Sequence, residues 1–243
     1  MHHVVLERWS RGNSFIHRRD PRAKIVTLLV FLVSLATARH NLVTLSLALL
    51  ALLLAAVIVA GLPLAGAVGR AGIVLPFTAV FAAVCWLAGD PARGMALLLK
   101  SYLSALAVLV VVSTTPLPVL IRGLEMTGAP RFLLMVAQFL YRYLFVISEE
   151  AQHMSKAALS RGATARSLMG SRSRFRAAAG ALAVLFARSY GRAEDIHRAM
   201  LARGFPGHFR TLEGLHFRAS DACFALLSSL APVLLRVAVE RVS

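Results

Sequence analysis

The chain has 243 residues, of which 58% are hydrophobic, and its mean hydropathy is +0.71. This composition excludes an ordinary soluble domain, and the length leaves room for several membrane-spanning helices. The formal net charge of +16 is high for so apolar a chain, so the distribution of its cations is informative.

Lysine and arginine are concentrated in two segments. Of 27 such residues, six lie in residues 1–24 and fifteen in residues 122–218, which leaves six for all other positions. This is how membrane proteins distribute cations when their basic segments stay inside the cell. Nucleic-acid binding would also explain a basic chain, but no recognisable binding module accompanies the charge and the apolar runs are too long.

Five apolar runs are long enough to be predicted as membrane spans. The first follows Asp20 and Pro21, which suit an N-cap and a first helical position. It is short, so an even number of spans is the alternative if it does not cross. Residues 1–20 show no signal-peptide pattern, and we expect the N-terminus to stay in the cytoplasm. The expected spans are residues 25–38, 42–60, 73–88 (with a kink near Pro76), 95–113 and 219–239, and residues 61–72 are expected to form a connection back to the cytoplasmic side.

The pattern changes after Pro116 and Pro118. Apolar residues then recur at helical spacing with polar residues between them, which predicts two amphipathic helices over residues 131–160 and 172–202. Thirty helical residues extend about 45 Å. We therefore expect an all-α integral membrane protein with about five transmembrane helices and a cytoplasmic domain of long amphipathic helices. Its parts are residues 1–116, 117–218 and 219–243.

Each predicted amphipathic helix ends in a similar motif. Residues 156–162 read Lys-Ala-Ala-Leu-Ser-Arg-Gly and residues 198–205 read Arg-Ala-Met-Leu-Ala-Arg-Gly-Phe. Glycine is favoured just past a helix end, and a terminal arginine suits the negative end of the helix dipole. One such motif is common as a simple cap. Its repetition in matched register favours a docking role for Ser160, Arg161, Gly162, Ala202, Arg203 and Gly204, with each guanidinium entering a groove lined by carboxylates or carbonyls.

Motifs for catalysis or metal binding are absent from the sequence. The neighbouring carboxylates of Glu149 and Glu150, like those of Glu194 and Asp195, diverge by about 100° on a helix. We expect them to pair with arginines such as Arg142, Arg198 or those of residues 172–176 and so to hold the two long helices together.

Isolated polar residues also receive structural interpretations. Lys100 is expected to extend its ammonium toward water rather than bind a transported solute. Cys85 and Cys223 are expected to be small core residues. The remaining candidates, which are expected to be solvated or interfacial rather than metal ligands, are His2, His3, His153, His197, His208 and His216.

With its paired arginine motifs after several spans, the chain resembles the transmembrane T component of energy-coupling factor (ECF) transporters, and in particular the CbiQ type of cobalt uptake systems. Three further stretches match that type: residues 17–24 (His-Arg-Arg-Asp-Pro-Arg-Ala-Lys), residues 114–116 (Thr-Thr-Pro), and Tyr-Arg-Tyr at 141–143 followed by Glu149 and Glu150. The chain departs from the pattern at Ser160, where alanine is expected.

The resemblance implies a set of partners and a location. It implies two cytoplasmic ABC ATPase subunits that receive the arginine motifs, and a separate membrane subunit (the S subunit) that binds substrate, here cobalt. It also implies a bacterial inner membrane, no cofactor, and no catalysis by this chain. Two alternatives stay open: a T component that serves vitamin-binding subunits, and a self-contained secondary transporter or channel. The latter would need polar groups or broken helices in two repeated halves, and the sequence offers only Lys100.

Overall fold

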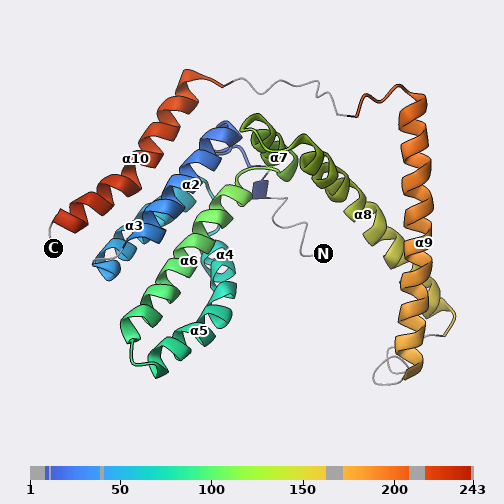
Figure 1. Ribbon diagram of the computed structural model, residues 1–243, viewed down its shortest axis with the longest axis horizontal. Helices are drawn as coiled ribbons and strands as arrows, with labels where there is room; N and C mark the ends of the chain where they lie inside the picture. Colours follow the sequence, from blue (N-terminus) through green and yellow to red (C-terminus); the bar gives the residue numbers. More distant parts are fainter. Residues whose placement is uncertain (1–8, 11, 39–40, 163–171, 208–216, 242–243) are drawn as a thin grey trace. The chain divides into compact units, whose positions relative to one another are not determined.

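The computed structural model describes residues 9–10, 12–38, 41–162, 172–207 and 217–241, and these are helical with connecting turns and no strand. The chain divides into two compact units (Figure 1). The first, called the bundle unit, comprises residues 1–128 and 213–243, and the second, called the two-helix unit, comprises residues 129–212. The prediction of three parts at 1–116, 117–218 and 219–243 rests on their placement about a membrane and stays a prediction.

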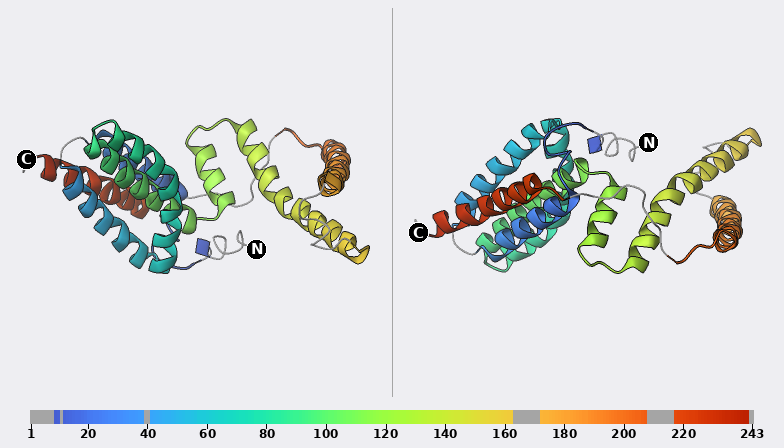
Figure 2. Two further views of the ribbon diagram at one scale, coloured as in Figure 1. Left: turned by 90° about the horizontal axis from the view of Figure 1, so that it is seen from below. Right: turned by 90° about the horizontal axis from the view of Figure 1, so that it is seen from above.

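The bundle unit brings the end of the chain back against its beginning (Figures 1 and 2). Helix α10 packs along α2, and α5 packs closely against α6. The helices of this unit are α2 (Pro21–Thr37), α3 (Leu42–Val59), α4 (Leu64–Ala71), η1 (Gly72–Val74), α5 (Leu75–Leu87), α6 (Pro91–Ser113), α7 (Leu117–Met126) and α10 (Ala219–Arg241).

Aspartate caps start two of these helices, of which the sequence predicted only that of α2. The Asp20 carboxylate accepts a hydrogen bond from the Arg22 backbone N–H at 2.8 Å, and Pro21 opens α2. The Asp90 carboxylate accepts from the Arg93 N–H at 3.1 Å, with Pro91 following. Aspartate satisfies an N–H group that has no partner within the helix, and proline has none to satisfy. The predicted starting residue of α2 is confirmed.

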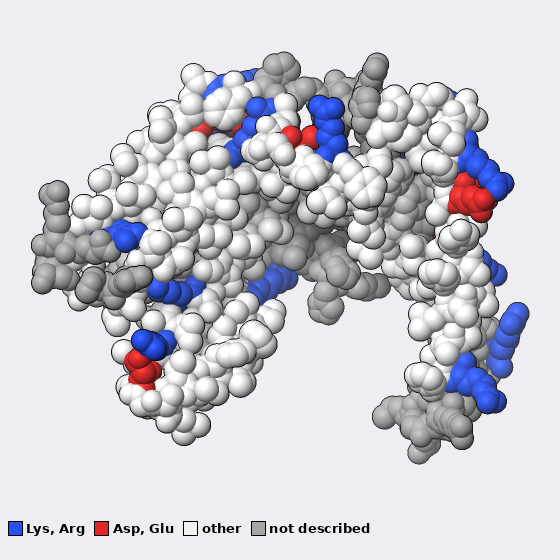
Figure 3. All heavy atoms as spheres, in the orientation of Figure 1, with Lys and Arg blue, Asp and Glu red and all other residues white. Residues whose placement is uncertain are grey.

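Apolar residues of α2, α3, α4 and α6 form the core. Its fully buried members include Leu35 of α2, Leu49 and Val57 of α3, and Leu106 of α6. Helix α5 joins through a close approach to α6, because a Cβ on Gly94 would lie 2.9 Å from the Ala82 carbonyl oxygen. Much of the remaining surface is apolar, and the visible face of the bundle carries few charged side chains (Figure 3). Such a surface suits lipid or a membrane partner.

The expected connection over residues 61–72 is instead largely helical. Pro63 stands at the N-cap of α4, which continues through the short 3₁₀ turn of η1 into α5. The prediction failed because the glycines were taken as breakers. In the fold one of them is a contact residue: Gly66 lies against Trp9, and its neighbours Ala67 and Ala71 are buried. Tertiary packing here overrides a weak local propensity.

Helices α2 and α10 run parallel and contact each other through polar groups at three levels. At the beginning of both helices, Asp20 donates its backbone N–H to the Asp221 carboxylate at 3.5 Å. Midway, the hydroxyls of Thr27 and Ser228 are 2.7 Å apart. At the far end, the Arg236 guanidinium donates to Thr37. Because the contacts occur at the beginning, the middle and the end of α2, the two helices lie side by side along its whole length.

Lys100 contacts the end of α2. Its Nζ donates to the carbonyl oxygens of Ala36 and Ala38 at 3.1 and 2.8 Å. These carbonyls lie at the C-terminal end of α2, where a cation is favoured by the helix dipole. Lys100, which is half-buried, thus bonds the carbonyls at a helix end, a contact that the sequence did not predict.

The two-helix unit consists of α8 (Arg131–Ser160) and α9 (Arg172–Ala202), and both predicted ranges are confirmed. The Arg188 guanidinium of α9 lies 2.5 Å from the Glu150 carboxylate of α8. Beside this ion pair, apolar side chains of both helices line a groove of about 350 Å³, which includes Val136, Leu140, Ile147, Ile196 and Met200. An ion pair and a narrow apolar contact hold the two helices together.

Among the described residues, five helical segments are long and apolar enough to cross a membrane: Leu42–Val59, Leu64–Leu87, Pro91–Ser113, Arg131–Ser160 and Ala219–Val239. The protein is therefore an all-α, multi-pass membrane protein. The structure differs from the sequence prediction at two helices. Helix α2, with 17 residues, is shorter than this length requirement, whereas α8 meets it although its amphipathic pattern placed it outside the membrane.

Candidate functional site

The C-terminal end of α8 has the predicted capped geometry. Arg161 is the C-cap residue, and its N–H donates to the carbonyls of Ala157 and Ala158. Gly162 follows with φ of 87°, and its N–H donates to the Leu159 carbonyl at 3.0 Å. A left-handed glycine here lets the chain leave the helix without a Cβ clash. The arginine is thus the last residue presented before the chain turns away.

The end of α9 repeats this geometry. Arg203 is followed by Gly204 with φ of 72°, whose N–H donates to the Leu201 carbonyl at 2.9 Å. The Phe205 N–H donates to the Met200 carbonyl at 3.0 Å, which completes the paired bonds of a Schellman motif. The two helix ends, which we call the arginine tips, therefore share both sequence register and backbone conformation.

Each arginine tip also exposes a leucine beside its arginine. Leu159 and Leu201 are 55% and 56% exposed, and Arg161 and Arg203 are exposed as well. An apolar side chain two positions before a guanidinium gives each tip a mixed surface, able to fill a pocket and to donate to carboxylates. Sequence reasoning treated these leucines only as helix formers, although their place in both motifs was a usable signal.

The first tip has Ser160 where the second has Ala202, but the two tips remain similar. Its hydroxyl donates to the Lys156 carbonyl one turn earlier, at 3.1 Å. Because the hydroxyl hydrogen is used within the helix, Ser160 presents a surface similar in size to that of Ala202.

The arginine tips close two different helices. The first ends α8 and the second ends α9, whose thirty-one residues extend about 45 Å.

The carboxylates near the tips are placed differently from the sequence prediction. Glu150 pairs with Arg188, whereas Glu149 lies 3.8 Å from His153 on its own helix. Glu194 pairs with Arg198 one turn later, at 2.5 Å. Arg142 lies over the Tyr143 ring, 5.9 Å from its centroid. In the described part of the chain, the ion pair that joins the two helices is that of Glu150, through a partner that sequence reasoning did not name.

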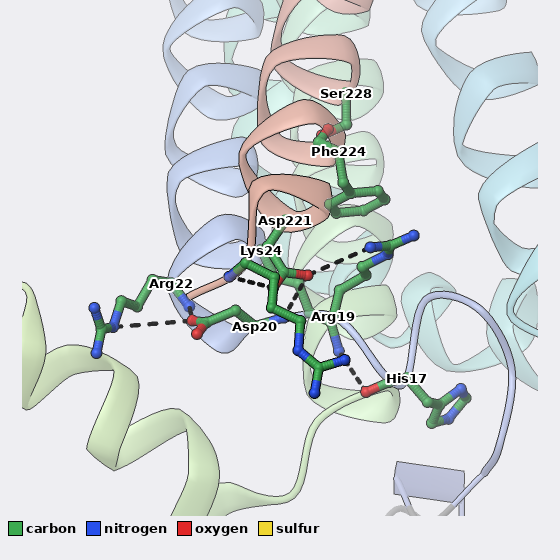
Figure 4. A network of polar contacts seen from close by, with 9 residues as sticks. His17, Arg19, Asp20, Arg22, Lys24, Asp221, Phe224 and Ser228 are labelled. Carbon is green, nitrogen blue, oxygen red and sulfur yellow. Dashed lines mark hydrogen bonds and ion pairs between the residues drawn. The ribbon is translucent and has the colours of Figure 1, made fainter. Parts of the chain in front are cut away.

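A second polar site lies at the beginning of α2, where Lys24 is 3% exposed (Figure 4). Its Nζ donates to the Thr115 hydroxyl at 2.8 Å, to the Thr114 carbonyl at 3.0 Å and to the His17 carbonyl at 3.5 Å. These bonds use all three donors of the ammonium. The stretches 17–24 and 114–116, which were separate in the sequence analysis, thus meet around this lysine.

Asp221 joins the same site from α10 and is also buried. It accepts from the Arg19 guanidinium at 3.5 Å (Figure 4). It also accepts from the Arg218 N–H at 3.2 Å, and Arg19 lies over the Phe15 ring at 3.9 Å. Sequence reasoning noted Asp221 only as a polar start of the last span. A carboxylate at the start of an apolar helix was the available signal for this contact.

Histidine and cysteine form no metal site within the described part of the chain, where groups of three or more potential ligands are absent. His2, His3, His208 and His216 lie outside the described residues. Cys85 is half-buried and Cys223 is exposed, both as free thiols, so neither is the core residue that the sequence suggested.

Comparison with known proteins gives a consistent result. The family described as cobalt transport protein (CbiQ) matches residues 12–212. An uncharacterized protein of Methanocaldococcus jannaschii is 23% identical over 255 residues, with 96% of this chain and 85% of the relative covered. The cobalt transport protein CbiQ of Rhodobacter capsulatus is 30% identical over 124 residues, with 50% of this chain and 48% of the relative covered.

A third relative represents the broader transporter class. The energy-coupling factor transporter transmembrane protein EcfT of Bacillus selenitireducens is 26% identical over 235 residues, with 84% of each chain covered. The family match extends from the segment before α2 through both arginine tips. The chain therefore belongs to the CbiQ family and is a transmembrane T component of the energy-coupling factor transporter class.

Proposed function

We propose that this chain couples two cytoplasmic ABC ATPase subunits to a membrane S subunit and so drives uptake of cobalt ions. The observation that carries the proposal is the pair of arginine tips, Leu-Ser-Arg-Gly and Leu-Ala-Arg-Gly, with the same backbone geometry at the ends of α8 and α9. Two equivalent tips, each closing a different helix, suit two equivalent grooves. ATP hydrolysis belongs to the partners, and this chain has no catalytic role.

Mechanical coupling follows from the stiffness of the helices. Each guanidinium donates to carboxylates or carbonyls in an ATPase groove, and the adjacent leucine fills an apolar part of it. When the ATPases close on ATP and open after hydrolysis, the tips follow them. The Glu150–Arg188 ion pair and the apolar groove beside it transmit this movement between α8 and α9.

The S subunit would pack against apolar surface in the membrane. On α3, Ala48, Ala51 and Ala55 share one face, and the last two are exposed. Small residues at such spacing allow close approach of another helix. Movement of the coupling helices would then reorient or release the S subunit.

The proposed orientation follows the charge distribution. The basic segment of residues 122–218 lies on the cytoplasmic side of a bacterial inner membrane, together with the N-terminus. Because α10 runs parallel to α2, the C-terminus lies on the outer side if both helices cross.

Cobalt as the substrate is suggested by the name of the Rhodobacter relative and by the family description. The alternative is a T component for vitamin-binding subunits. The S subunit that co-purifies with the chain from its native membrane decides between them, because the S subunit binds the substrate.

A self-contained transporter or channel is the alternative from another class. Its best candidate for an intramembrane ligand is Lys100, but the ammonium of that residue is already bonded to two carbonyls at the end of α2. Uptake of the ion by the purified chain alone in sealed vesicles would favour this alternative.

The test is co-purification with candidate ATPase subunits, comparing the natural chain with an Arg161→Glu, Arg203→Glu double variant. A matched control is Arg131→Glu, Arg176→Glu, which reverses two exposed charges near the beginnings of the same helices. Acidic residues are favourable near a helix N-terminus, so the control should fold normally. We expect the natural chain and the control to retain an ATPase and the tip variant to lose it. Equal capture by all three would refute docking through the tips.

A further inference from the structure

A polar cavity of about 820 Å³ lies beside the beginnings of α2 and α10. Its walls come from the segment before α2, from α7 and from the first turn of α10, all within the bundle unit. The lining residues include three arginines (Arg18, Arg19 and Arg218) and two aspartates (Asp20 and Asp221). Counted over the described residues, the lining therefore has a surplus of one positive charge.

The two aspartates are already satisfied by the protein. Asp20 accepts from the Arg22 N–H, and Asp221 accepts from the Arg218 N–H and the Arg19 guanidinium. Both residues are buried. Their charges are therefore matched by internal donors and do not serve as ligands for a cation in the cavity.

Two of the arginines have no such partner. Arg19 is occupied by Asp221 and Phe15, but Arg18 and Arg218 are exposed and their guanidinium groups have no bonding partner among the described residues. Two guanidinium forks without a bonding partner in the described part of the chain are suited to a phosphate group.

The surroundings of the cavity indicate which kind of phosphate-containing molecule would bind there. Asp221 lies in the first turn of α10, a helix apolar enough to cross a membrane, so the cavity lies at the level where lipid headgroups are found. Phe15 on its wall is more than half exposed, and farther along α10 the large exposed side chains are apolar: Leu226, Leu227 and Leu230. A polar cavity that opens beside such a surface fits a molecule with an anionic head and acyl chains.

We propose that this cavity binds the phosphate of an anionic phospholipid, held by Arg18 and Arg218. The bound headgroup neutralises the surplus charge, and its acyl chains lie along the apolar surface of α10. The site depends on the membrane location of the chain and is independent of ATPase docking by the arginine tips.

The experiment measures lipid binding to the purified full chain by native mass spectrometry, with phosphatidylglycerol, phosphatidylcholine or inorganic phosphate as the probe. The test variant is Arg18→Gln, Arg218→Gln. The control, Arg161→Gln, Arg203→Gln, removes the same two charges from the arginine tips. The Arg218 N–H that bonds Asp221 is unchanged by the test substitution, so folding should persist, and melting in detergent without lipid checks this.

We expect phosphatidylglycerol to bind the natural chain and the control alike, and the test variant at least about tenfold more weakly. Phosphatidylcholine, whose headgroup has no net charge, should bind weakly to all three. Equal binding of phosphatidylglycerol to the test variant overturns the site. Displacement of phosphatidylglycerol by inorganic phosphate at similar concentration overturns the lipid as the source. The tip control should lose ATPase capture but keep the lipid, so failure of one proposal is distinguishable from failure of the other.

Discussion

Replacement of Lys24 by methionine tests whether the buried site at the beginning of α2 stabilises the bundle unit. Methionine keeps most of the side-chain length but removes the ammonium. The Thr114 carbonyl and the Thr115 hydroxyl then lose donors at 3.0 and 2.8 Å. Because Lys24 is 3% exposed, water cannot readily replace those bonds.

The expected magnitude follows from these contacts. A hydrogen bond to a charged group contributes about 1.5–3 kcal/mol, and a buried polar group left unsatisfied costs about 1–3 kcal/mol. We take about 3 kcal/mol for Lys24→Met. For a chain of this size, about 1 kcal/mol shifts the melting temperature by about 2–4 °C, so the expected decrease is about 10 °C.

The assay is thermal unfolding of the purified chain in one detergent, with Lys156→Met as the control. Lys156 is exposed on α8, so its substitution should change stability by less than about 0.5 kcal/mol. If Lys24→Met melts at the same temperature as this control, the buried ammonium does not stabilise the bundle and the reasoning is refuted.

The remaining predictions concern the arginine tips and the α5–α6 contact. A Leu159→Ser, Leu201→Ser double variant should weaken ATPase binding at least about tenfold in a pull-down titration, because each leucine loses about 1.5–3 kcal/mol of burial, while melting is unchanged. Ser160→Ala should bind as the natural chain does, and a loss of binding would show that its hydroxyl contacts the partner. Gly94→Ala should lower the melting temperature, because its Cβ would lie 2.9 Å from the Ala82 carbonyl oxygen. A melting temperature equal to that of the natural chain would show that the two helices separate at little cost.

The sequence by itself determined the features that depend on neighbouring residues. The starts of α2 and α8, the extent of α9 and the left-handed glycines after Arg161 and Arg203 were all predicted. Caps, helical periodicity and C-terminal glycines act within one or two turns, so a linear pattern contains the necessary information. The similarity of the two tips was visible for the same reason.

The tertiary structure alone decided the features that depend on distant residues. Helix α4 forms across two glycines, of which Gly66 packs against Trp9, and Glu150 pairs with Arg188 because α8 and α9 pack together there. Lys24 contacts Thr115 across 91 positions, and the Asp20 N–H contacts Asp221 across 201. The sequence alone does not say which distant residues meet in each of these contacts. The packing of the helices decides this, and a buried charged residue is tolerated only where a specific partner meets it.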